Sequence, residues 1–381
     1  MFITNSSSFP VGLDISDLSL KLFQLNRSRD KIKIQAIGKY NLPRGLVEDG
    51  EIKNKAEVLK AIEQLFDKPK FGKVSSKEIV ACLPETKTFI KLIEADITPN
   101  DFAETIKSEI EKHIPMAVDE IYYDWQLIKK IGSKQLVLIA AAPKEIVDQY
   151  SRLFEEAGLS LVALEIESVA ICRSLLAEEH YKFKSVAAVN YGIIDIGAKR
   201  TSMTVYSGNT ILLTMSIPIS GEKITEEIAK SLKIDMNLAE KAKIICGFDE
   251  NRAQGIVKNI LNQMIEDLIG KLKEVIKYYG YHFPNQGPIN RLLLCGGGAK
   301  IENIDKILSQ ALSLDVAMGD PLRNLNEERD KFAKVLQETH KIGSEISAKS
   351  EKNKPLSLTQ DNSLTYTTAI GLALRGIFFD Q

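Results

Sequence analysis

The 381-residue chain has few of the residues from which metal centres and disulfide frameworks are built. Its four cysteines and four histidines are scattered, and neither a C-x-x-C nor an H-E-x-x-H pattern occurs. A structural zinc site needs such residues paired at short spacing. We therefore expect four reduced thiols and no dedicated zinc site.

Targeting signals and long apolar segments are also missing. The first ten residues contain no basic segment followed by an apolar run, so we expect no signal peptide. The most apolar run, residues 136–142, is far shorter than the roughly 20 residues that cross a bilayer. These absences predict a cytoplasmic protein.

Neither sign of charge dominates. The formal net charge is −1, so we expect no general surface for nucleic acid. A content of 44% hydrophobic and 27% charged residues is typical of a soluble globular protein, and the length suits two or three lobes. The sequence contains no Walker A motif and no G-x-S-x-G motif.

Residues 187–221 carry the clearest local pattern. An apolar strand ends at Ile196, directly after Asp195, and Gly197 and Ala198 predict a tight turn. Two further strands joined by a hairpin follow, the last ending near Pro218. A carboxylate before a turn of small residues can lie beside a metal–phosphate pair, with backbone N–H groups near phosphate oxygens.

Residues 10–42 repeat this order of features. An apolar strand containing Asp14 is followed by a short turn and by two strands around a polar hairpin at 26–30. The repetition predicts two similar lobes that face each other across a cleft. Short Asp-containing turns are common, so a chance similarity of two hairpins remains open at this point.

Residues 86–158 show a different pattern of predicted strands and helices from the segments on either side. They predict strands over 86–94, 121–128 and 135–142, a helix over 99–113 that starts at a 98–101 signal, and a helix over 144–157. This pattern indicates a compact α+β insert. Because it contains no paired acid and base, partner recognition is a better prediction for it than chemistry.

The second half of the chain is richer in helix. Residues 222–246 predict one helix, stopped by Gly247, on which Glu240 and Lys243 share a face. A longer helix over 259–279 has an apolar stripe that should face the core.

A short strand over 291–295 runs into three glycines at 296–298, and a helix is expected from about Ile301. Such a loop lets a ligand approach the backbone closely, although many triple-glycine loops are plain turns. Residues 324–363 are polar and predict a partly disordered linker.

Three motifs in this order resemble the actin-like ATPase superfamily. They are the spacing from Asp14 to Lys21, the D-x-G at Asp195–Gly197 and the strand followed by three glycines. The resemblance covers nearly the whole chain. It implies an α/β fold with two duplicated ribonuclease H-like lobes, a small α+β insert and a nucleotide between the lobes.

A narrower resemblance is to the type IV pilus assembly protein PilM family. It rests on EKHIPM at 111–116, YDWQ at 123–126, AAAPK at 140–144 and AIGLALRG at 369–376. The position of the insert is shared with the cell-division protein FtsA. The resemblance implies five parts: a first lobe (9–85 with 159–185 and 364–381), the insert (86–158), a second-lobe core (186–221 with 286–323), its helical subdomain (222–285) and the linker (324–363).

The resemblance also implies roles for individual residues around ATP and Mg²⁺. Asp14 and Asp195 would hold magnesium, largely through water, and Lys21 would reach the phosphates. The remaining implied nucleotide contacts are Ser16, Gly197, Ala198, Lys199, Thr201, Glu240, Lys243, Gly296, Gly297 and Gly298. Turn-capping aspartates, an exposed strand lysine and a solvated helix face are the structural alternatives.

Two departures from the family pattern put hydrolysis in doubt. Ser16 stands where the family usually has glycine, so a positive φ there would cost about 1 kcal/mol or more. Lys199 and Arg200 stand where hydroxyl residues are usual, and they could contact phosphate or form an exposed tip. Glu167 is the one acid we nominate to position water.

The implied function is a cytoplasmic ATP-binding protein that binds the N-terminal cytoplasmic tail of a PilN-like membrane protein. It would be peripheral to the inner membrane through this partner, with pilus motor ATPases and further copies of itself as other candidate partners. The tail would dock in a groove between the insert and the first lobe. An FtsA-like division protein, which would need a C-terminal amphipathic anchor not found here, and a small-molecule kinase are the alternatives.

Overall fold

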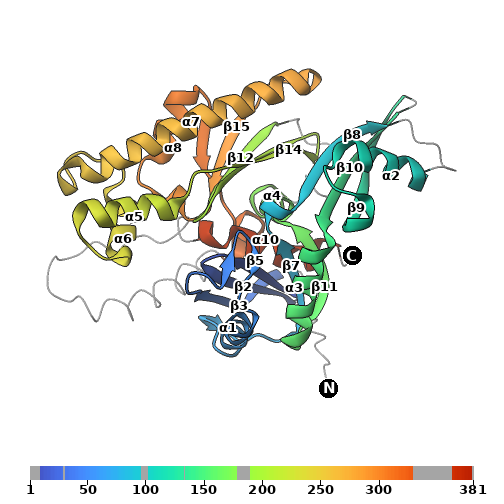
Figure 1. Ribbon diagram of the computed structural model, residues 1–381, viewed down its shortest axis with the longest axis horizontal. Helices are drawn as coiled ribbons and strands as arrows, with labels where there is room; N and C mark the ends of the chain where they lie inside the picture. Colours follow the sequence, from blue (N-terminus) through green and yellow to red (C-terminus); the bar gives the residue numbers. More distant parts are fainter. Residues whose placement is uncertain are drawn as a thin grey trace.

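A computed structural model describes residues 9–28, 31–95, 102–132, 134–177, 189–328 and 363–379. The predicted helix-start signal at 98–101 lies outside these residues. So does most of the predicted linker, of which only 324–328 and Ser363 are described. In Figure 1 the first lobe is drawn in blue, with its later segments in green and red, the insert in cyan and green, and the second lobe in yellow-green to orange.

Six strands form the sheet of the first lobe, in the spatial order β11-β7-β1-β2-β3-β6. In it β1 is antiparallel to β2 and parallel to β7, and β7 is parallel to β11. The strands are β1 (Val11–Ser16), β2 (Ser19–Ser28), β3 (Lys31–Asn41), β6 (Phe71–Gly72), β7 (Glu78–Leu83) and β11 (Ser160–Ile166).

The sheet of the second lobe has the order β14-β13-β12-β15-β16, which repeats β3-β2-β1-β7-β11 with the same directions of pairing. Its strands are β12 (Tyr191–Ile196), β13 (Thr201–Ser207), β14 (Thr210–Ile217), β15 (Arg291–Cys295) and β16 (Asp315–Met318). The predicted duplication is confirmed, and the alternative that the two hairpins are similar only by chance is wrong.

Helices cover both faces of the first sheet because its strands are apolar on both sides. Helices α1 (Lys55–Asp67) and α3 (Lys144–Glu156) pack on one face, and α4 (Glu167–Leu175) and α10 (Thr367–Phe379) on the other. Figure 1 shows α10, in red, at the centre of the molecule. The end of the chain therefore completes the lobe that its beginning starts.

The helices of the second lobe correct two predictions. The expected helix over 222–246 is two helices, α5 (Gly221–Leu232) and α6 (Met236–Cys246). They separate because Lys233 takes a left-handed φ of 54° and the Asp235 carboxylate caps the start of α6. The three glycines lead into a short 3-10 turn, and α8 (Ile304–Leu312) begins later than predicted.

The long helix α7 (Ile256–His282) confirms the predicted core-facing stripe, with Leu261, Leu268 and Leu272 fully buried. No described helix is long and apolar enough to cross a membrane.

The insert is a three-stranded sheet in the order β8-β10-β9 with one helix of its own. Its elements are β8 (Phe89–Ala95), α2 (Phe102–His113), β9 (Ile121–Ile131) and β10 (Lys134–Pro143). Helix α3 follows β10 directly, but it buries Tyr150, Leu153 and Phe154 in the core of the first lobe. We therefore propose that the insert ends at Pro143 and that α3 belongs to the first lobe.

Candidate functional site

A cavity of about 620 Å³ lies between the two lobes, a volume typical of small-molecule sites. Both duplicated hairpins contribute to its wall, as do α4, α6 and the glycine loop. Every residue predicted for the nucleotide, the metal or the water lines this cavity: Asp14, Ser16, Lys21, Glu167, Asp195, Gly197, Ala198, Lys199, Thr201, Glu240, Lys243, Gly296, Gly297 and Gly298.

The first hairpin presents one carboxylate and one ammonium group. Asp14 on β1 lies directly opposite Lys21 on β2, and Lys21 Nζ is 2.7 Å from Asp14 Oδ2. Burial lowers the pKa of Lys21, but the charge and hydrogen bond of Asp14 and the charges of Glu167 and Asp195 together outweigh burial and raise that pKa. The ammonium therefore stays charged at the floor of the cavity, where it can meet an anion.

Ser16 needs no unusual backbone at the turn of this hairpin. Its φ is not among the positive values of the chain, so the expected strain of about 1 kcal/mol is absent. Its hydroxyl donates to the backbone oxygen of Ser19 at 3.0 Å. A serine therefore fits this turn without strain.

The second hairpin places Asp195 opposite Ser202, at the position equivalent to the Asp14–Lys21 pair. Burial raises the pKa of Asp195 to about 6; the positive charge of Lys21 works against this shift, and the negative charge of Asp14 adds to it. Two carboxylates thus share a single lysine. A divalent cation at this point would relieve their repulsion.

The turn after Asp195 is closed by its own backbone. Gly197 N–H donates to Arg200 O at 2.9 Å, and Thr201 Oγ1 donates to Ile219 O at 3.2 Å. In this arrangement the Gly197 N–H and the Thr201 hydroxyl are already hydrogen-bonded within the protein and are not available to a ligand. Ala198 and Lys199 supply the part of the turn that faces the cavity.

Two further glutamates, Glu167 and Glu85, line the cavity and have buried carboxyl groups. Glu167 begins α4, and Thr368 Oγ1 on α10 donates to it at 3.3 Å. Burial and the charge of Asp195 raise the pKa of Glu167 well above its ordinary value. Glu85 was not predicted: it stands between β7 and the insert, hydrogen-bonded to Ser202, and its Oε1 is buried without a partner.

Glu85→Gln is expected to stabilise the protein at pH 8 and to change little at pH 5. Burial raises the pKa of Glu85 from 4.5 to about 7, so between these values the folded state holds a proton that the unfolded state has lost. The stability contributed by this group therefore falls as pH rises through that window. The gain from an uncharged side chain at pH 8 should be about 2 kcal/mol or more.

Urea unfolding at the two pH values measures this difference. Glu63→Gln, the same change on the exposed side of α1, is the control and should show no such dependence on pH. An equal effect of Glu85→Gln at both pH values would contradict the buried, protonated state.

Ion pairs cross the mouth of the cavity between the lobes. Arg44 Nε lies 2.7 Å from Glu222 Oε1, and Arg200 Nε lies 3.7 Å from Asp49 Oδ1. Lys199 Nζ pairs with Glu222 Oε2 at 2.5 Å inside the second lobe. Both residues of the Lys199–Arg200 tip are therefore ion-paired, Lys199 within the second lobe and Arg200 with the first lobe.

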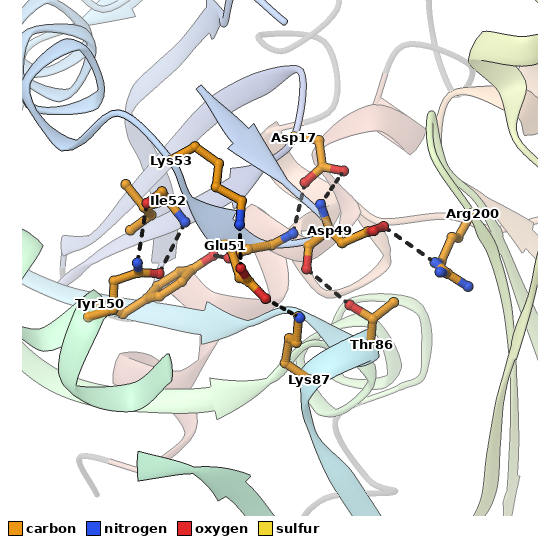
Figure 2. A network of polar contacts seen from close by, with 11 residues as sticks. Asp17, Asp49, Glu51, Ile52, Lys53, Thr86, Lys87, Tyr150 and Arg200 are labelled. Carbon is orange, nitrogen blue, oxygen red and sulfur yellow. Dashed lines mark hydrogen bonds and ion pairs between the residues drawn. The ribbon is translucent and has the colours of Figure 1, made fainter. Parts of the chain in front are cut away.

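Figure 2 shows the polar contacts around the short hairpin formed by β4 (Val47–Glu48) and β5 (Glu51–Ile52). Asp17 accepts from the N–H of Asp49 at 3.2 Å, and Asp49 O accepts from Thr86 at 3.4 Å. Glu51 pairs with Lys87 at the start of the insert. One hairpin therefore contacts the first lobe's turn, the insert and Arg200 of the second lobe.

The opposite end of the cavity contains Glu240 and Lys243 on α6. Lys243 Nζ donates to Glu240 Oε2 at 2.7 Å, Thr225 Oγ1 at 2.8 Å and Gly221 O at 2.9 Å. With its side chain 4% exposed, Lys243 braces α5 against α6. Glu240, at 49%, is the member of the pair that is open to a ligand.

The glycine loop leaves space where a side chain would otherwise stand. Gly296 has a φ of 81°, and a Cβ there would lie 2.1 Å from Asp195 Oδ1. A Cβ on Gly297 would meet no atom within 4 Å, so this residue faces the open cavity, whereas Gly298 packs on Ile196. Backbone at this surface can lie flat against a ring.

These groups fit a nucleotide with a magnesium ion. Lys21 and the hairpin turns suit phosphates, Gly297 and Glu240 suit the base and the sugar, and Asp14 and Asp195 suit a metal held mostly by water and phosphate. No group of three or more potential ligands among histidine, cysteine, aspartate and glutamate occurs in the described part of the chain. That agrees with an ion which takes only one or two carboxylates from the protein.

Several lining residues carried no local signal in the sequence. These lining residues are Asp17, Lys39, Arg44, Glu85, Glu222 and Thr368. Lys39 faces Lys21 across β2 and β3, and burial together with Lys21 lowers its pKa to about 8. In the sequence, Lys39 could have been predicted as a cavity residue only from the strand register that places it opposite Lys21.

Comparisons with known sequences agree with this geometry. A model of the family described as type IV pilus assembly protein PilM matches residues 12–342. FtsA of Neisseria meningitidis is 21% identical over 267 residues, which are 61% of this chain and 63% of that protein. FtsA of Bacillus subtilis is 20% identical over 365 residues, 83% of this chain and 80% of that protein.

Solved structures show the same fold. A PilM–PilN type IV pilus biogenesis complex has a TM-score of 0.73 at 23% identity and covers 97% of this chain and 98% of that one. EutJ of Carboxydothermus hydrogenoformans has a TM-score of 0.54 at 17% identity, with 96% and 89% covered. MreB5 of Spiroplasma citri bound to AMPPNP has 0.50 at 15% identity, with 87% and 98% covered. The fold is therefore that of the two-lobed actin-like proteins.

Proposed function

The chain belongs to the type IV pilus assembly protein PilM family, and we propose that it is an actin-like ATP-binding protein of the pilus assembly machinery. The observation that carries the proposal is the cavity in which Asp14, Lys21 and Asp195 meet the glycine loop. We further propose that it binds the N-terminal cytoplasmic tail of a PilN-like membrane protein.

We propose that nucleotide binding, rather than rapid turnover, is the output of the cleft. Glu167 is the candidate for positioning water, but its raised pKa favours the protonated carboxyl group, which cannot accept a proton from water. The ion pairs of Arg44 and Arg200 join the lobes at the mouth. A bound nucleotide that contacts both lobes would favour this closed arrangement.

The tail is proposed to dock between the insert and the first lobe, beside α3 and along β11, which is an edge strand of the first lobe's sheet. Val162 on β11 is 54% exposed, which is unusual for a large apolar side chain on a strand. Support for a PilN-like partner comes from the similar fold of the PilM–PilN complex.

Val162→Asp is expected to weaken binding of a PilN-type N-terminal peptide by about tenfold or more, because an extended apolar segment would lose its contact with this edge. Fluorescence anisotropy with a labelled peptide measures the affinity. The matched control is Leu238→Asp, the same kind of change at an exposed side chain of α6. Equal affinity of the wild type and Val162→Asp would refute docking at β11.

Point substitutions are preferable to removal of residues 86–158. That deletion would take away α3, whose Tyr150 and Phe154 are fully buried in the first lobe. Loss of binding would then report unfolding rather than loss of the groove.

An FtsA-like division function is less well supported than the pilus function. The family model that matches most of the chain is that of PilM, whereas the FtsA sequences cited above are 20% and 21% identical. A small-molecule kinase would need a base beside an acceptor pocket. Asp14, Glu167 and Asp195 of the cavity instead interact with Lys21.

A further inference from the structure

The sheet of the insert has one covered edge and one open edge. At the covered edge, β8 packs against β14 of the second lobe, and Ile90 and Leu92 contact that lobe's core. At the other edge, β9 pairs with β10 and with no further strand among the described residues. An open edge offers a row of backbone N–H and C=O groups to another chain.

Strand β9 is exposed on both faces, which is unusual for a strand of 11 residues. Tyr123, Trp125 and Leu127 share one face and are 40%, 42% and 38% exposed. Across the pairing they lie opposite Ala141, Ile139 and Val137 of β10, which are buried under α2. The three side chains therefore extend the apolar face of the insert beyond the reach of its helix.

The backbone at the centre of this stripe faces outward. Trp125 N–H donates to the carboxylate of its own neighbour Asp124 at 2.8 Å. An amide bonded to the preceding side chain is the arrangement expected where the N–H points away from β10. In antiparallel sheets, residues two apart point their backbone groups to the same side, so Tyr123 and Leu127 share this direction.

Charges of opposite sign stand at the two ends of β9. Asp119 and Glu120 precede β9, and Lys129 and Lys130 stand near its other end. All four are exposed, and none of them makes an ion pair within the described ranges. In a second copy running antiparallel, the acidic end of each strand would lie beside the basic end of the other.

We propose that β9 pairs with β9 of a second copy of this chain, antiparallel and centred on Trp125. The two insert sheets then join into one, related by a twofold axis as in most dimers. The stripes of Tyr123, Trp125 and Leu127 adjoin across the axis, and opposite charges meet at both ends. This inference goes beyond the nucleotide and tail sites and does not depend on either.

Charge reversal tests the pairing. D119K/E120K and K129E/K130E should each weaken self-association by about tenfold or more, since like charges would then face each other at both ends. Mixing the two variants should restore association to nearly that of the wild type, because every contact is again between opposite charges. Sedimentation velocity over a wide range of concentration measures all four samples.

The matched control is E266K/D267K, which reverses two adjacent exposed acids on α7 and should associate like the wild type. Circular dichroism confirms that each variant folds. A wild type that stays monomeric at the highest concentration, or reversed variants that associate as well as the wild type, would overturn the proposal. Loss of tail-peptide binding with no change in association would instead place the tail on β9 and equally rule out self-pairing.

Discussion

Asp195→Ala is expected to abolish binding of ATP in the presence of Mg²⁺ while leaving the fold intact. The carboxylate stands at the floor of the cleft, with Lys21, Asp14 and the glycine loop around it. A cation held by two carboxylates would lose one of its protein groups and the charge that attracts it. The affinity should fall by at least about 100-fold.

The fold should survive because the ionised carboxylate of Asp195 destabilises the folded protein. Burial and the neighbouring Asp14 disfavour its charge, which is why its pKa rises to about 6. Removing the group relieves that cost, so thermal stability at neutral pH should stay the same or increase.

Isothermal titration calorimetry measures the affinity, and thermal unfolding measures the fold. Asp315→Ala serves as the control because it makes the same change at the exposed edge of the same sheet, where Asp315 pairs with Arg291 at 2.9 Å. If Asp195→Ala bound ATP with Mg²⁺ as tightly as the wild type, the assignment of the nucleotide site to this cavity would be wrong. Asp195→Asn separates charge from shape, and it should bind as poorly as the alanine variant.

Gly371→Ala is expected to destabilise the first lobe strongly. Helices α10 and α4 approach so closely that a Cβ on Gly371 would lie 1.9 Å from Ala170 O and 2.5 Å from Ala170 C. These are backbone atoms, so no side chain can turn aside to make room. The helices must separate, and the free energy of unfolding should fall by about 3 kcal/mol or more.

Separation would also disturb a buried ion pair. Arg173 lies on α4 with its side chain 2% exposed, pairs with Glu165 at 2.7 Å and donates to Gly371 O at 2.9 Å. Displacing α10 removes the carbonyl from this arrangement. Because Thr367 and Thr368 at the start of α10 line the cavity, nucleotide binding should weaken as well.

Gly270→Ala is the matched control. It makes the same substitution within helix α7, where a Cβ would meet no atom within 4 Å. Alanine should there raise stability by about 0.5–1 kcal/mol through helix propensity. Chemical denaturation measures both variants, and similar small effects in the two would show that α10 and α4 are not held as closely as the structure indicates.

The sequence by itself determined the two-lobed fold, and its resemblance to the actin-like superfamily named the candidate nucleotide contacts that the structure places around the cleft. The fold follows from local order: a strand containing an aspartate, a short turn and two more strands occur twice, with a glycine loop after the second copy. Residues within one hairpin come together through its own register, as Asp14 and Lys21 do. The closer resemblance to the pilus family likewise rested on short contiguous motifs.

The tertiary structure alone decided what depends on contacts between distant segments. Glu85 lines the cavity and its side chain reaches Ser202 on β13 of the second lobe, and the apolar face of α3 is buried in the core of the first lobe. Lys199 and Arg200 pair with Glu222 and Asp49, partners that only the folded chain brings within reach. Side chains such as these carry no periodic pattern of their own, so their roles emerge only when the lobes are folded together.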